Sequence, residues 1–214
     1  MSRDGPLGVF GGTFNPVHYG HLRSAVELVE RLDLAELRLM PSAMPPHRAA
    51  PECGAEHRAA MVALAVAEEP LLSCDDRELR RDGPSYTIDS LLELRADCGD
   101  ARPLCMVMGC DAVQGIETWH RWTELLDVAH VVVLSRPGWA LPERGVVADW
   151  LADNALPDEA ALAQRPCGGV LVQELRPLDI SSTEIRELLA AGRSIRYLMP
   201  QSVLDYIDAQ QLYR

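Results

Sequence analysis

Short apolar runs alternate with segments of helical periodicity along the chain, and this alternation limits the possible folds more than any other feature. Apolar runs predict strands at residues 7–10, 37–40, 71–74, 104–108, 130–134 and 170–175. Helical patterns lie at residues 21–32, 56–67, 88–95, 122–126, 146–151 and 183–191, and Pro200 opens a last helix. Strands that alternate with helices are typical of βαβ units. The sequence therefore predicts an α/β fold with a Rossmann-like, doubly wound, mostly parallel sheet.

A single domain is predicted over residues 1–214, with a core at about 6–180 and a small C-terminal helical part at about 181–214. The tract 136–169 is rich in Pro and Gly and is interpreted as an insertion or cover. Ligands of such folds bind at the carboxyl ends of the strands. We therefore look for chemistry in the loops that follow strands, at residues 11–21, 41–48, 109–122, 135–139 and 176–186.

The basic residues narrow the possible functions, because all 20 of them are Arg and the chain contains no Lys. This excludes a Schiff-base lysine, a Walker A loop and a protein kinase of the usual kind. The formal net charge of −12 argues against a nucleic-acid partner, which a basic patch would bind.

The expected location of the protein and the expected state of its cysteines depend on motifs that the sequence lacks. No apolar signal segment follows Met1, and the apolar run 131–134 is far shorter than a membrane helix requires. A cytoplasmic protein without a membrane partner is therefore expected. The six Cys form no C-x-x-C pair, and we interpret Cys74, Cys105 and Cys110 as small buried hydrophobes in a reducing compartment.

The first loop, residues 11–21, is rich in Gly and connects a strand to a helix, a geometry that offers backbone N–H groups to an anion. His18 and His21 are three residues apart and point the same way on a helical turn. Gly20 between them is interpreted as leaving room for a ligand. The pair has three possible roles: two ordinary histidines, a metal pair, or a clamp that donates N–H bonds to a phosphate.

The last loop, residues 180–186, begins a helix in which Ser181 and Glu184 fit a capping box. Ser182, Thr183 and Arg186 could form a second anion site there, and both roles can hold together.

Three segments in the middle of the chain have two interpretations each. At residues 83–91, Ser85 or Thr87 is a helix cap, or the free N–H groups of the helix start take a carboxylate. Asp111 follows a strand, a position suited to hold a sugar hydroxyl or an amine. The Trp residues of segment 118–122 pack in the core or at the surface, or one of them stacks on a flat ring.

The run GGTFNPVHYGHL at residues 11–22 resembles the signature of bacterial nicotinate-mononucleotide adenylyltransferases, members of the nucleotidylyltransferase superfamily with its H-x-G-H motif. The segments 45–48, 83–89, 109–111, 119–122 and 180–186 are similar to further motifs of that family. Arg48 stands where the family commonly has Lys, and Asn15 stands where Asp is expected.

The resemblance implies adenylyl transfer from ATP to nicotinate mononucleotide, which gives nicotinate adenine dinucleotide and pyrophosphate in a step of NAD biosynthesis. An adenylyltransferase that prefers nicotinamide mononucleotide or another phosphate acceptor is the nearest alternative, and a non-catalytic nucleotide sensor is a remote one. Mg²⁺ is expected on the ATP phosphates, with no metal site built from protein side chains. Assembly of several copies is compatible with the sequence.

The resemblance also assigns residues to the two substrates. The predicted catalytic residues are His18, His21 and Arg186. ATP is expected to contact these three together with Gly11, Gly12, Thr13, Phe14, Gly109, Asp111, Ser182 and Thr183. The mononucleotide is expected to contact Asn15, Arg48, Tyr86, Thr87, Trp119 and His120, with Trp119 stacked on its ring.

Overall fold

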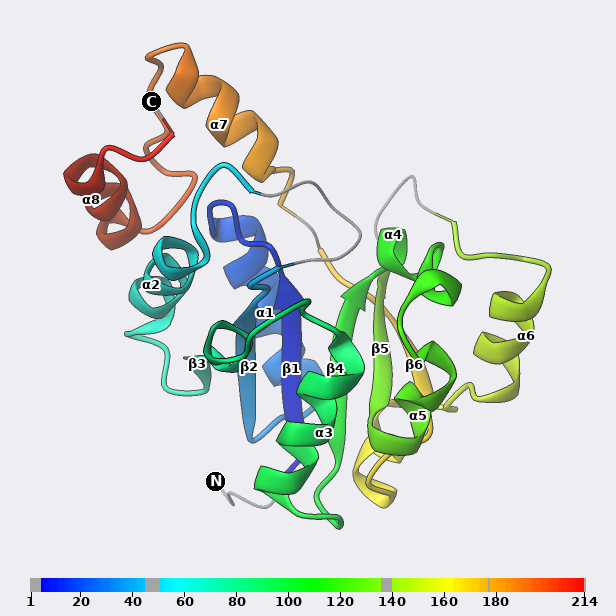
Figure 1. The fold of residues 1–214 in the computed structure, drawn as a ribbon. Helices are drawn as coiled ribbons and strands as arrows, with labels where there is room; N and C mark the ends of the chain where they lie inside the picture. The colour runs from blue at the N-terminus through cyan, green and yellow to red at the C-terminus, as the bar shows by residue number, and fades with distance from the viewer. Residues whose placement is uncertain (1–4, 45–50, 136–139, 177, 214) are drawn as a thin grey trace. The chain divides into compact units, whose positions relative to one another are not determined.

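A six-stranded sheet is the centre of the fold in the computed structural model, which describes residues 5–44, 51–135, 140–176 and 178–213. The strand order is β3-β2-β1-β4-β5-β6, and the pairs β1–β4, β4–β5 and β5–β6 are parallel (Figure 1). This is the order of a doubly wound Rossmann fold, so the predicted fold class is confirmed. The strands are β1 Leu7–Gly12, β2 Glu36–Pro41, β3 Leu72–Cys74, β4 Leu104–Gly109, β5 His130–Ser135 and β6 Val170–Glu174.

The helices agree with the predicted segments to within a few residues at each end. Helix α4 and three 3-10 turns, Arg77–Arg80, Ile116–Thr118 and Glu159–Gln164, were not predicted, because so short a segment has no periodicity to detect. The predicted helix at 122–126 is a 3-10 turn, Trp122–Glu124, followed by α5. The helices are α1 Tyr19–Arg31, α2 Ala55–Val66, α3 Thr87–Cys98, α4 Cys110–Val113, α5 Leu125–Val128, α6 Val146–Asp153, α7 Ser182–Ala190 and α8 Gln201–Gln210.

The chain divides into two compact units. The first comprises Met1–Gly11, Glu27–Leu37 and Tyr86–Leu175, and the second comprises Gly12–Val26, Arg38–Ser85 and Arg176–Arg214. In the first unit α5 packs on α3 and on β5, and in the second α2 packs on β3 and on α8 (Figure 1).

The central strands are covered on both faces. Every residue of β4 and of β5 except the last is buried, as expected for parallel strands whose crossover helices lie on either side of the sheet. The partly exposed last residues are Gly109 and Ser135. The carboxyl ends are therefore the least buried parts of these two strands.

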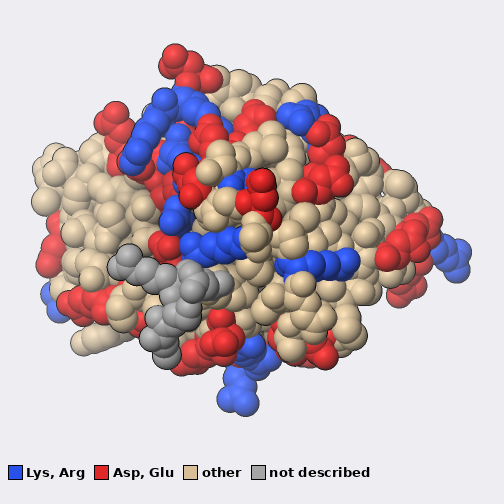
Figure 2. Space-filling model, turned by 90° about the horizontal axis from the view of Figure 1, so that it is seen from below, with Lys and Arg blue, Asp and Glu red and all other residues tan. Residues whose placement is uncertain are grey.

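On the face that Figure 2 shows, the Asp and Glu side chains do not form one continuous acidic patch. There the Arg side chains lie among Asp and Glu side chains. Within the described ranges, no helix is both long enough and apolar enough to cross a bilayer.

The cysteines are all free thiols, and two of the three predicted buried ones lie in the core. Cys105 and Cys110 are buried, whereas Cys74 is half-buried. Burial raises the pKa of the Cys105 thiol to about 12, so this side chain stays protonated at neutral pH.

His130 is a titratable residue inside the core, at the start of β5, with an exposed fraction of 0%. The Gly169 N–H donates to its Nδ1 over 3.1 Å, and its Nε2 lies 2.9 Å from the carbonyl oxygen of Arg165. Because Nδ1 accepts, the neutral ring carries its hydrogen on Nε2 and donates it to that carbonyl. Burial lowers the pKa of His130, and a second proton on Nδ1 would oppose the Gly169 N–H.

This burial predicts acid-sensitive stability. A histidine whose folded pKa lies below its unfolded value of about 6.5 contributes stability that is present above that pH and is lost below it. Denaturant unfolding of the wild type and of His130→Gln between about pH 7.5 and 5 tests this. The difference in their free energies of unfolding should shrink as the pH falls, and a difference that stays constant across the range would contradict the prediction.

Candidate active site

The turn from β1 into α1 brings the two predicted histidines together. The rings of His18 and His21 have centroids 3.8 Å apart at an angle of 34°. The Phe14 ring meets His21 edge-on, with centroids 5.0 Å apart. His18 is 4% exposed, so its ring is held within the cluster rather than on a free surface. The predicted pair is thus one ordered group at the start of a helix, where the backbone favours anions.

Gly20 decides which nitrogen of His18 carries hydrogen. The Gly20 N–H donates to His18 Nδ1 over 3.1 Å, so the neutral ring has its hydrogen on Nε2, and Nε2 is the ring's donor atom. A Cβ on Gly20 would lie 2.9 Å from two atoms of the His18 ring. The prediction that Gly20 leaves room for a ligand is therefore wrong, because the His18 ring itself occupies the space.

A buried guanidinium holds the loop that precedes these histidines. Arg58 of α2 is 1% exposed and lies among backbone carbonyls. It donates to the oxygens of Thr13 and Ser42, both over 2.7 Å, and to that of Cys53 over 3.1 Å. Burial lowers the pKa of Arg58, but an arginine remains charged at neutral pH. These charge-assisted bonds are strong, so Arg58 fixes the start of the loop.

Helix α7 contributes the second predicted anion-binding segment. The Ser181 hydroxyl accepts the Glu184 N–H over 3.1 Å, which confirms that Ser181 caps the helix. The next hydroxyl, that of Ser182, donates to the Pro16 carbonyl oxygen over 2.9 Å. A hydroxyl has one hydrogen to donate, so Ser182 cannot donate to a phosphate while it makes this bond.

Arg186 is the cation of this segment. Its Nη1 donates to the Asn15 carbonyl oxygen over 2.8 Å, and its Nε lies 3.9 Å from a carboxylate oxygen of Glu52. A guanidinium has five donor hydrogens, so further donors remain for an anion. Thr183, in the first turn of the same helix, is exposed. Among the side chains of this segment, Arg186 and Thr183 are therefore the ones best able to bind phosphate.

Asn15 makes an internal hydrogen bond. Its side chain is 8% exposed, and its Oδ1 accepts the Tyr213 hydroxyl over 2.8 Å. Its predicted contact with a mononucleotide stays a prediction, because this oxygen is already engaged with the C-terminal segment of the chain.

The Gly residues of the first loop differ in their surroundings. Gly11 is exposed and a Cβ there would meet no atom within 4 Å. Gly12 is half-buried, and a Cβ there would lie 2.9 Å from the Phe14 ring. Gly12 therefore lets Phe14 fold back over the loop.

The predicted ring-binding residues belong to the other compact unit. Tyr86 is the N-cap of α3 and makes no side-chain capping bond, and Thr87 is the first residue of the helix. The Tyr86 ring stacks on His120 with centroids 4.4 Å apart. The alternative that Ser85 or Thr87 caps this helix is wrong, because the Ser85 hydroxyl accepts the N–H groups of Ala43 and Met44 instead.

Two further predicted residues follow β4. A Cβ on Gly109 would overlap with Asp111 Oδ1, so the exposed Asp111 carboxylate lies over this glycine. Trp119 is half-buried and ends a 3-10 turn through its N–H to Ile116. Trp122 packs edge-on against Trp150, with centroids 5.7 Å apart. Trp122 thus has a packing role. Stacking of Trp119 on a substrate ring stays a prediction.

Some predicted features fall elsewhere. Arg48 lies outside the described residues. Within the part of the chain that the structure describes, no group of three or more His, Cys, Asp and Glu side chains is placed to hold a metal ion.

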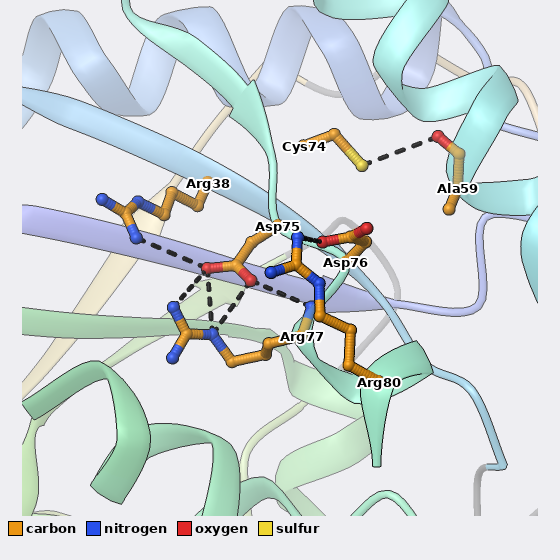
Figure 3. A network of polar contacts seen from close by, with 7 residues as sticks. All are labelled: Arg38, Ala59, Cys74, Asp75, Asp76, Arg77 and Arg80. Carbon is orange, nitrogen blue, oxygen red and sulfur yellow. Dashed lines mark hydrogen bonds and ion pairs between the residues drawn. The ribbon is translucent and has the colours of Figure 1, made fainter. Parts of the chain in front are cut away.

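A second polar cluster lies at the end of β3 (Figure 3). Arg77 donates to the Asp75 carboxylate through Nε over 2.9 Å and through Nη2 over 2.8 Å. Arg38 Nη1 lies 3.5 Å from the same carboxylate. Burial raises the pKa of Asp75, but the bonds from Arg77 outweigh it and the net shift is downward. Asp75 is therefore a buried ionised group that orders the turn after β3 rather than a site residue.

Sequence reasoning missed Arg58 and Tyr213. Arg58 lies on the buried face of α2 with Met61 and Val62, and an arginine within an apolar stripe is a signal that could have been noticed. Tyr213 follows the last helix in a polar segment, where no pattern indicates a contact.

The fold, the site and the similarity of this chain to known proteins together define the class of protein. The family described as Cytidylyltransferase-like matches residues 9–188, so the chain is a member of that class. A relative from Aeromonas hydrophila, named "Probable nicotinate-nucleotide adenylyltransferase", is 50% identical over 209 residues, or 98% of this chain and 97% of the relative. A relative of the same name from Halorhodospira halophila is 51% identical over 199 residues, or 92% and 90% of the two chains. The chain belongs to the nicotinate-nucleotide adenylyltransferase family.

Solved structures agree in fold. A nicotinic acid mononucleotide adenylyltransferase of Plasmodium falciparum, solved with NaAD, superposes with a TM-score of 0.72 at 16% sequence identity. The match covers 98% of this chain and 97% of the other. At this identity the likeness supports the fold alone.

The Gly20 contact predicts a change that can be seen without substrate. Gly20→Ala should displace the His18 ring and release its Nδ1, because the new Cβ would lie 2.9 Å from that ring. Nitrogen NMR of the histidine side chains should show His18 with a bare Nδ1 in the wild type and a mixture of tautomers in the variant. Gly54→Ala is the control, since a Cβ there meets nothing within 4 Å. An unchanged His18 tautomer in Gly20→Ala would contradict the prediction.

Proposed function

We propose that this chain transfers the adenylyl group of ATP to nicotinate mononucleotide, with release of pyrophosphate. A phosphate oxygen of the mononucleotide forms a bond to the α-phosphorus of ATP, and the bond from that phosphorus to the oxygen bridging to the β-phosphorus breaks. The observation that carries the proposal is the ordered His18–His21 pair behind a Gly-rich turn, with the ring hydrogen of neutral His18 on Nε2.

The chemistry needs no general base from the protein. The attacking group is a phosphate whose second pKa is about 6, so it is largely ionised at neutral pH. The protein must instead position the two phosphates in line and balance the negative charge that develops at the α-phosphate. His18 and His21 are suited to that task because their N–H groups are hydrogen-bond donors at a helix start.

ATP is proposed to bind through residues of the two loops and of the segment after β4. Arg186 holds the departing phosphates with the donors that Asn15 does not use. Backbone N–H groups at the start of α7 add further donors, whereas the Ser182 hydroxyl serves the loop itself. The remaining proposed contacts are Gly11, Gly12, Thr13, Phe14, Thr183, Gly109 and Asp111.

Mg²⁺ is proposed to enter on the ATP phosphates, where it neutralises part of their charge. This ion keeps several of its waters and binds substrate phosphates readily, so it needs few protein ligands. The net charge of −12 makes such neutralisation important, since the chain as a whole repels ATP.

The pyridine ring of the mononucleotide is proposed to bind in the other unit. Trp119 would stack on the ring, and Tyr86, Thr87 and His120 would surround its carboxylate. The absence of a side-chain cap at Tyr86 supports this role, because N–H groups at the start of α3 then remain for a carboxylate. Asn15 and Arg48 are proposed to contact the mononucleotide as well.

Removal of either histidine tests the proposed clamp. His18→Ala and His21→Ala should each lower kcat for pyrophosphate release by roughly 10²–10³, or about 2.7–4 kcal/mol, as expected for loss of one donor to the charge of the transition state. His57→Ala is a control in the same unit, because its ring bonds the hydroxyl of Tyr206. A loss of about tenfold or less in both test variants would be too small for such a donor and would refute the clamp.

A further inference from the structure

The last residues of the chain return to the loop that carries the histidine pair. Helix α8 ends at Gln210, and the next residue, Gln211, has a left-handed conformation with φ of 54°. The Leu212 N–H then bonds the Ile207 carbonyl oxygen over 3.0 Å, which reverses the chain. Tyr213 follows, and its hydroxyl meets Asn15, a residue 198 positions earlier.

The contact between these two side chains has a defined direction. Asn15 Oδ1 can only accept, so the Tyr213 hydroxyl is the donor over 2.8 Å. Burial raises the pKa of Tyr213 far above its usual value, so the phenol keeps the hydrogen that it donates. Because Asn15 is 8% exposed, little water can replace this bond.

Three polar groups of this part of the loop have separate anchors. The main-chain oxygens of Asn15 and Pro16 accept from Arg186 and Ser182, which hold the path of the backbone. The Tyr213 hydroxyl holds the Asn15 side chain, which the other two donors do not touch. His18 lies only two residues after Pro16, so these anchors are next to the histidine pair in the chain.

We propose that Tyr213 is a positioning residue for the reaction, acting through Asn15 on the orientation of His18 and His21. This proposal rests on the proposed function, because its effect is measured as a change in kcat for adenylyl transfer. Tyr213 would then help to align the phosphates through Asn15, without touching a substrate itself. Small displacements of an aligned donor are costly in rate, so the contribution of Tyr213 should appear in kcat more than in KM.

Tyr213→Phe tests the proposal, because it removes the hydroxyl and keeps the ring. The matched control is Tyr206→Phe, which removes another half-buried hydroxyl that bonds a ring nitrogen of His57 over 2.9 Å. Tyr213→Phe should lower kcat by roughly tenfold with KM for both substrates changed less than about twofold. Tyr206→Phe should change kcat by less than about twofold while losing similar thermal stability. Equal kcat in the two variants, or an effect of Tyr213→Phe on KM alone, would overturn the proposal.

A double-mutant cycle separates positioning from general loss of stability. If Tyr213 acts through Asn15, Tyr213→Phe should lower kcat roughly tenfold in the wild type and less than about twofold in the Asn15→Ala background. Independent effects that multiply would contradict the proposed route.

Histidine NMR gives a readout that needs no turnover. Tyr213→Phe should shift the side-chain resonances of His18 and His21, whereas Tyr206→Phe should shift those of His57. Absence of pyrophosphate release in the wild type would count against the proposed function, and the NMR comparison would still decide the positioning role. Unshifted His18 and His21 resonances in Tyr213→Phe would overturn that role.

Discussion

The site depends on backbone carbonyls of one turn being held by donors from distant parts of the chain. Between β1 and α1 the chain reverses over a few residues, and its carbonyl oxygens at Thr13, Asn15 and Pro16 accept from side chains of α2 and α7. Arg58 and Arg186 each supply a short charge-assisted bond to one of them. A buried carbonyl without a partner would be costly, so these donors stabilise the fold as well as the loop.

The same anchors explain how an acidic protein can handle a polyphosphate. With all 20 cations being Arg, the chain has planar, multi-donor groups that can bind a carbonyl and an anion together. Arg186 does the first in the structure and is proposed to do the second. The chemistry then rests on geometry, because the attacking phosphate is already ionised and His18 has a set tautomer. The bonds that hold the turn therefore also set the geometry on which the proposed reaction depends.

The sheet and the histidine pair could be predicted because both are encoded locally. Buried strands such as β5 are continuous apolar runs, and the spacing of His18 and His21 places them on one side of a turn. The roles of Gly20 and Ser182 could not, because each depends on which group lies opposite in the folded chain. Gly20 makes room for its neighbour His18 rather than for a ligand, and the Ser182 hydroxyl meets a carbonyl 166 positions earlier. Long-range pairing of this kind leaves no periodicity in the sequence.

The proposed reaction is adenylyl transfer to the acid form of the pyridine mononucleotide. Pyrophosphate release from ATP and Mg²⁺, with nicotinate mononucleotide and nicotinamide mononucleotide run side by side, tests it most directly. We expect rapid release with nicotinate mononucleotide and little with the amide, since the uncapped start of α3 offers N–H donors that suit a carboxylate. Comparable rates with both would contradict the carboxylate pocket, and no release with either would contradict the proposed reaction.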